Sequence, residues 1–150
     1  MGWTMTKMEL ENLEKQPVHV LIVDDDADSA ALIASIFDHL GCQTICTLTP
    51  TDAEKNICAG HVDLIILDWI LDDHTDAKAV MDKCSAIFSR FGIQMANNTK
   101  PKVITYSGLK ASEVELLTSP YFIHLDHWQK PIPYMSLLKR TLKVLEEIEH

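Results

Sequence analysis

The stretch Asp63-Leu64-Ile65-Ile66-Leu67-Asp68 decides the fold of this chain. Four consecutive apolar residues closed by a carboxylate are typical of a strand that is buried on both faces, and the run is too short for a buried helix. Such strands occur in parallel sheets that are covered by helices. Ligands of open parallel sheets bind beyond the carboxyl ends of the strands, and this is the expected position of Asp68.

A second apolar run, residues 18–23, also ends in carboxylates, Asp24-Asp25-Asp26. If the two strands are neighbours, at least three carboxylates converge at one edge of the sheet. Carboxylates at such short range repel one another, so they need a cation or a raised pKa. The sequence therefore predicts a metal site at this edge.

The rest of the chain alternates between strand-like and helix-like segments. Further strands are expected at about residues 43–48, at 103–106 and within 123–128. Helices are expected between the strands, including a short one at 111–118, and a last helix begins at Pro133. This alternation predicts a doubly wound α/β fold with right-handed crossovers. Residues 1–16 are expected to be a leader, partly disordered or helical, and residues 17–149 a single domain.

Composition narrows the class of function. The net charge of −9 argues against a nucleic-acid partner, which would need a basic surface. No apolar run approaches the ~18 residues that a membrane span needs. The four cysteines, Cys42, Cys46, Cys58 and Cys84, lack paired metal-ligand spacing and are expected to be reduced thiols in a cytoplasmic protein.

Charged and polar residues follow four of the predicted strands. Asp24 and Asp25 follow the first, Asp68 the third, Ser107 the fourth and Lys130 the fifth. This set suggests the capture of a phosphoryl group, with Asp68 as nucleophile. Asp24 and Asp25 would hold Mg²⁺, which prefers oxygen ligands. Lys130 would neutralise a phosphoryl oxygen, and the Ser107 hydroxyl would donate a hydrogen bond to the product.

At this point the chain resembles a family, the receiver domains of two-component response regulators. The resemblance rests on four motifs in order: Val23-Asp24-Asp25, Leu67-Asp68, Ser107-Gly108 and Lys130-Pro131. It implies a five-stranded parallel sheet in the order 2-1-3-4-5 flanked by five helices, as in CheY-like proteins. It also implies that Asp68 accepts phosphate from a partner's phosphohistidine with Mg²⁺, and that the Lys130-Pro131 bond is cis.

The resemblance further implies a metal shell and a switch. Asp24, Asp25, Asp68 and the backbone carbonyl of Ile70 would surround Mg²⁺. Ser107 and His127 would form the switch, although the family usually places Tyr or Phe where His127 stands. The acceptor loop also departs from the family pattern, because Leu71-Asp72 replaces Met-Pro and Thr75-Asp76 replaces Asp-Gly.

The leading hypothesis is therefore a stand-alone receiver that signals through a protein partner and turns over no free substrate. Its upstream partner would be a sensor histidine kinase or a phosphotransfer protein, and it would be a monomer or a phosphorylation-dependent homodimer. One alternative is a pseudo-receiver, a binding module without phosphorylation. A weaker alternative is an aspartyl-nucleophile phosphatase, which normally has a second Asp at the position of Ile70. The output surface is expected on the predicted fourth helix, fifth strand and last helix. Leu137 and Val144 lie off the expected inward stripe of the last helix, so they either form part of a docking or dimer surface or fill the edge of the core.

Overall fold

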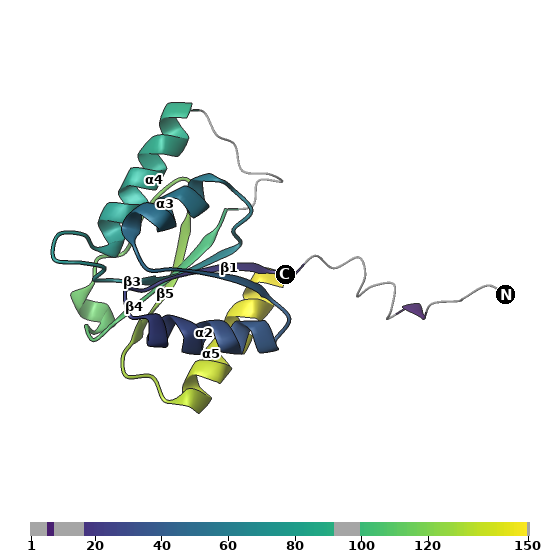
Figure 1. Ribbon diagram of the computed structural model, residues 1–150. Helices are drawn as coiled ribbons and strands as arrows, with labels where there is room; N and C mark the ends of the chain where they lie inside the picture. Colours follow the sequence, from purple (N-terminus) through teal and green to yellow (C-terminus); the bar gives the residue numbers. More distant parts are fainter. Residues whose placement is uncertain (1–5, 8–16, 92–99, 150) are drawn as a thin grey trace.

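Five parallel strands form one sheet in the computed structural model, which describes residues 6–7, 17–91 and 100–149. The strands are β1 (His19–Val23), β2 (Gln43–Thr47), β3 (Leu64–Asp68), β4 (Lys102–Ser107) and β5 (Ile123–Gln129). They pair in the order β2-β1-β3-β4-β5, so the predicted α/β fold class and strand order are confirmed (Figure 1). The predicted leader, residues 1–16, lies outside the described residues except for Thr6 and Lys7.

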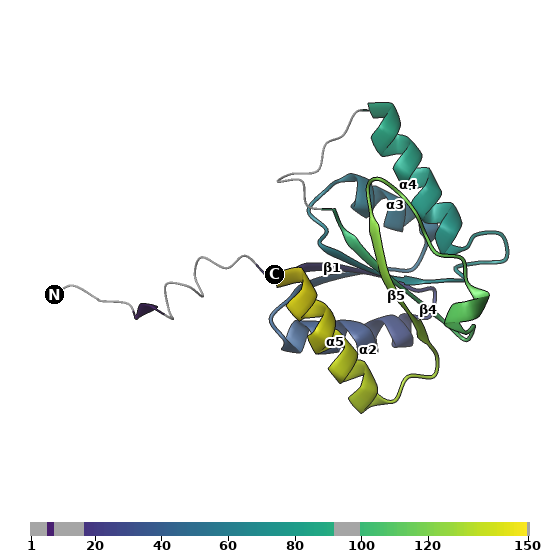
Figure 2. The ribbon, with the colours of Figure 1, turned by 180° about the vertical axis from the view of Figure 1, so that it is seen from behind.

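Helices cover both faces of this sheet. Among the described residues they are α2 (Ala27–His39), α3 (Pro50–Cys58), α4 (Ala77–Phe91) and α5 (Tyr134–Glu149). In Figures 1 and 2, α2 and α5 lie on one face, and α3 and α4 lie on the other. None of the helices described is long and apolar enough to cross a membrane.

The central strands supply both halves of the core because their side chains alternate between the faces. Ile22 and Ile66 belong to the cluster beneath α2 and α5, whereas Leu21 and Ile65 belong to the cluster beneath α3 and α4. The β3 residues are all buried, as the apolar run at residues 64–67 predicts. This placement leaves Asp68 at the carboxyl edge of the sheet, between β1 and β4.

The prediction of a fourth helix at residues 111–118 is wrong. Only a single 3₁₀ turn forms, η2 (Ala111–Glu113), and Val114 is already extended. Tertiary contacts compete with the helical pattern at the end of this segment, because the Leu117 N–H bonds to a His124 ring nitrogen and Thr118 forms a bridge with Ile123. The part of the chain described here thus has four α-helices, where the sequence predicts five.

The inward face of α5 also differs from the prediction. Leu137 and Val144, expected off the stripe, are buried, whereas Tyr134 and Leu142 are 57% and 45% exposed. The buried row passes through Thr141, whose hydroxyl donates to the Leu137 carbonyl at 2.8 Å and is satisfied within its own helix. Because Thr141 interrupts the apolar residues of this row, the sequence pattern does not identify the row as the buried face of the helix. Of the two interpretations of Leu137 and Val144, the docking surface is therefore wrong, and the filling of the core is confirmed.

Candidate functional site

Three carboxylates meet at the carboxyl edge of β1 and β3. Val23 pairs with Leu67, so the residues that follow them, Asp24 and Asp68, emerge side by side. Carboxylate oxygens of Asp24, Asp25 and Asp68 all lie within 4.8 Å of one another. Asp24 and Asp68 are buried and Asp25 is exposed. The acidic cluster predicted from the sequence is therefore present in the fold.

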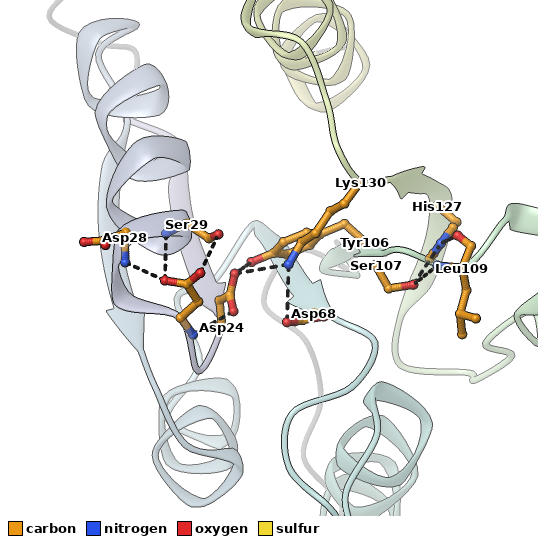
Figure 3. Close-up of polar contacts among 10 residues, drawn as sticks. Asp24, Asp28, Ser29, Asp68, Tyr106, Ser107, Leu109, His127 and Lys130 are labelled. Carbon is orange, nitrogen blue, oxygen red and sulfur yellow. Dashed lines mark hydrogen bonds and ion pairs between the residues drawn. The ribbon is translucent and has the colours of Figure 1, made fainter.

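The buried Asp24 is held from three directions. Its Oδ1 accepts a hydrogen bond from the Asp26 N–H at 2.9 Å, and its Oδ2 accepts one from the Tyr106 hydroxyl. The Lys130 ammonium lies 3.6 Å from Oδ2 (Figure 3). Because both Asp24 oxygens already have partners, a cation would reach Asp25 and Asp68 more readily and Asp24 through a water.

Lys130 lies over the centre of the site. Its Nζ is 3.5 Å from Asp68 Oδ2 and 4.3 Å from the centroid of the Tyr106 ring. The Lys130 N–H donates to the Ser107 carbonyl at 2.7 Å, which fixes where the lysine leaves β5. The Lys130-Pro131 bond is cis, as the resemblance implies. One ammonium faces three carboxylates, so the site has an excess of negative charge.

Burial and charge leave Asp68 difficult to ionise. Burial is the largest cause that raises the pKa of Asp68 to about 7; Lys130 lowers it and the nearby Asp24 raises it. Burial, followed by the hydrogen bond to Asp24, likewise raises the pKa of Tyr106. A divalent cation would relieve this repulsion, and carboxylate oxygens are the donors that Mg²⁺ prefers. The residues present therefore fit Mg²⁺.

Ser107 and His127 lie beside this cluster and contact each other. The Ser107 hydroxyl oxygen accepts from the Leu109 N–H at 3.1 Å and is 3.5 Å from His127 Nε2. Figure 3 shows the Ser107 hydroxyl turned toward His127 and Leu109 and away from the Asp68–Lys130 pair. His127 is 9% exposed, and its ring meets that of Trp69 edge to face.

Comparisons with solved structures match the fold over most of the chain. A CheY-like response regulator receiver domain from Methylobacillus flagellatus is 23% identical, with a TM-score of 0.66, over 89% of this chain and 99% of that one. A two-component response regulator from Clostridium difficile is 18% identical, with the same TM-score and coverage. A CheY-like receiver domain from Methanospirillum hungatei is 20% identical, with a TM-score of 0.65, over 89% and 98% of the chains. The chain has the fold of a response regulator receiver domain. No protein-family model matches the sequence, and no curated protein does.

In this fold the loop after Asp68, residues 69–76, closes without the Pro and Gly of the family pattern. The N–H groups of Leu71 and Asp72 both donate to the Thr75 carbonyl, and Ile70 pairs with Asp76 in an isolated bridge. The Asp76 carboxylate then accepts from the Ala79 N–H at 2.9 Å in the first turn of α4. The altered sequence therefore still gives a tight loop. Ile70 is 56% exposed beside Asp68, and its backbone N–H lowers the pKa of the Asp68 carboxyl.

Two residues of this candidate site were not identified from the sequence. Tyr106 donates to Asp24 and lies under Lys130, and the fully buried Thr105 bonds to His127. Both are β4 residues that look like ordinary strand formers. The available signal was strand alternation, because Tyr106 lies between two polar residues and so points to the opposite face.

The raised pKa of Asp68 gives a testable pH dependence in metal-free protein. Between about pH 4 and pH 7 the folded state holds a proton on Asp68 that the unfolded state has lost, so stability falls as pH rises through this range and is level above it. Asp68→Asn removes this loss of stability, so at pH 8 its free energy of unfolding should exceed that of the wild type by on the order of 1 kcal/mol or more. At pH 4 the difference should be much smaller. Urea denaturation with EDTA at the two pH values measures this, and an equal difference at both would contradict the raised pKa.

Proposed function

We propose that this chain is a phosphorylation-controlled signalling module that accepts a phosphoryl group on Asp68. The observation that supports this most directly is the environment of Asp68. This buried carboxylate ends the central strand, with the Lys130 ammonium at 3.5 Å and an acidic cluster fit for Mg²⁺ beside it. The donor would be a histidine kinase or a phosphotransfer protein, and the output would be a protein partner. The reduced cysteines suit action in the cytoplasm.

The chemistry needs little beyond positioning and charge cancellation. An Asp68 oxygen forms a bond to phosphorus as the P–N bond of the phosphohistidine breaks, and the imidazole keeps that electron pair. Lys130 neutralises a phosphoryl oxygen, and Tyr106 and the Asp26 N–H hold Asp24 in place. Asp24, Asp25 and Asp68 would hold Mg²⁺, which would supply positive charge to offset the incoming phosphoryl oxygens.

The two alternative functions, a pseudo-receiver and a phosphatase, require different features of the site. A pseudo-receiver would bind a partner without phosphorylation, and the buried Asp68–Lys130 pair favours phosphorylation instead. A phosphatase of the aspartyl-nucleophile kind needs a general acid two residues after the nucleophile. Here that position is Ile70, whose side chain has no proton to donate.

Intact-mass measurement separates the three functions. The purified chain is incubated with acetyl phosphate, with Mg²⁺ or with EDTA. A receiver gains one phosphoryl increment only with Mg²⁺, and the pseudo-receiver gains none under either condition. A phosphatase releases phosphate steadily from a small phosphomonoester, which the receiver does not. Phosphorylation-dependent homodimerisation is then tested by sedimentation with and without beryllofluoride.

The lifetime of the phosphorylated form should depend on Ile70. Hydrolysis of the acyl phosphate needs an in-line water, and an apolar side chain cannot orient one. Ile70→Asn supplies an amide at this exposed position, so it should shorten the lifetime roughly threefold or more. Ile45→Asn is the matched control, because Ile45 is 52% exposed on β2, away from the site. Decay of the phosphoryl mass increment measures both variants, and a lifetime for Ile70→Asn at or above the wild-type value would contradict this role.

A further inference from the structure

A second polar cluster lies on the far side of β4 from Asp24. Thr105 on β4 contacts two histidines of β5: its hydroxyl oxygen is 2.9 Å from His124 Nε2 and 2.8 Å from His127 Nδ1. Residues three apart on a regular strand point to opposite faces. A register shift between Val103 and Ile104 inserts Leu125 as an extra residue, so His124 and His127 both face Thr105.

The direction of each hydrogen bond in this cluster is forced. The Leu117 N–H donates to His124 Nδ1 at 3.1 Å, so a neutral His124 carries its hydrogen on Nε2 and donates to Thr105. The Thr105 hydroxyl must then donate to His127 Nδ1. The remaining His127 hydrogen, on Nε2, donates to the Leu109 carbonyl at 2.9 Å. All of these hydrogen bonds can form together only when both imidazoles are neutral.

The two ends of this series of hydrogen bonds hold one loop. Leu109 and Leu117 bound the segment that contains η2, and no residue from 108 to 120 is buried. Leu109, Val114 and Leu117 pack against the core only as partly buried side chains, so hydrogen bonds to the sheet add to what holds the segment in place. It also begins directly after Ser107, whose hydroxyl accepts from the Leu109 N–H.

We propose that His124, Thr105 and His127 form a protonation-controlled clasp that holds residues 109–117 against the sheet and opens at the Leu117 end when His124 is protonated. The added hydrogen goes to Nδ1, where it faces the Leu117 N–H across 3.1 Å, and two donors cannot bond. A proton on His127 Nδ1 would oblige Thr105 to accept from both rings. Its own hydrogen would then lack an acceptor at a fully buried position.

The surrounding charges act on both rings. Glu115 and Asp126 line a pocket of about 230 Å³ together with both histidines. Asp82 of α4 lines a smaller pocket beside His124, and Arg140, Lys143 and Glu147 of α5 line a groove of about 460 Å³ beside His127. Despite the nearby acids, burial lowers the pKa of His124 below its usual value. The clasp therefore contributes stability above the ordinary imidazole pKa and loses it as pH falls.

The test uses the unphosphorylated, metal-free wild-type chain, so it does not depend on the proposed function. Long-range ¹H–¹⁵N spectra of the imidazoles should show both rings as the Nε2–H tautomer at pH 8. From pH 7.5 to 4.5, exchange of the Leu117 amide, corrected for its intrinsic rate, should rise roughly fivefold or more, as the loss of one hydrogen bond implies. An Nδ1–H tautomer in either ring at pH 8, or a pH-independent Leu117 exchange, would overturn the clasp.

Three variants assign the effect. Thr105→Val removes the hydroxyl at constant shape, so the His127 ¹⁵N shifts should no longer follow the titration of His124. Thr141→Val is the matched control, a fully buried threonine whose hydroxyl bonds only within α5, and it should behave as the wild type. Asp68→Asn should also keep the Leu117 response, although Asp68 titrates in the same range. Loss of the response in Asp68→Asn would place its origin in the acidic site and refute the clasp.

Discussion

Asp68→Asn should abolish the Mg²⁺-dependent phosphoryl mass increment of this protein. The substituted asparagine would keep the size and position of the side chain but would lack the carboxylate oxygen that forms the acyl phosphate. Asp24 and Lys130 do not compensate, since Asp24 already accepts hydrogen bonds on both oxygens and a protonated lysine has no free electron pair with which to attack phosphorus. Asp25 does not compensate either, because its carboxylate would be taken up in holding Mg²⁺. The expected labelled fraction after incubation with acetyl phosphate and Mg²⁺ is therefore zero.

The same substitution at the other end of β3 provides the control. The Asp63 carboxylate accepts from the His19 N–H at 2.9 Å, and an asparagine oxygen can do the same. Asp63→Asn should therefore be labelled like the wild type. Labelling that survives in Asp68→Asn would place the acceptor on another residue, and peptide mapping of the hydroxylamine-sensitive site would then locate it.

Mg²⁺ binding should weaken by an order of magnitude or more in Asp25→Ala, as the loss of a direct carboxylate ligand usually causes. Asp25 is the exposed member of the acidic cluster, so its oxygens are free to coordinate, whereas those of Asp24 already have protein partners. Its removal also leaves Asp24 and Asp68 with Lys130, which lowers the attraction for a dication. Isothermal titration of Mg²⁺ at pH 8, where Asp68 is largely ionised, measures the affinity.

Asp28→Ala separates coordination from net charge. Asp28 is an exposed carboxylate in the first turn of α2, outside the group of Asp24, Asp25 and Asp68. The Asp28→Ala substitution removes the same charge from the same region. The Mg²⁺ affinity of this variant should therefore change by less than about threefold, as expected for a screened surface charge. Equal affinities of Asp25→Ala and the wild type would mean that Mg²⁺ binds elsewhere.

The sequence by itself determined the sheet and the residues at its functional edge. Fully apolar runs such as residues 64–67 have one low-energy solution, a central parallel strand, because only a strand with helices on both sides buries every side chain. Since parallel strands end at the same edge, Asp24, Asp68 and Lys130 were placed together before any contact was known. Short-range patterns carried this information, and the tertiary structure agrees with it.

Only the tertiary structure decided which partners those residues find. The 111–118 segment forms only one 3₁₀ turn, because the Leu117 N–H bonds to a His124 ring nitrogen and Thr118 pairs with Ile123. The buried face of α5 includes Leu137 and Val144 because these side chains pack in the core cluster with β-strand residues. Tyr106 reaches Asp24, and one extra residue in β5 turns His124 toward Thr105. Strand register and bulges set these contacts. They depend on residues far apart in the chain, so the local period of the sequence does not contain them.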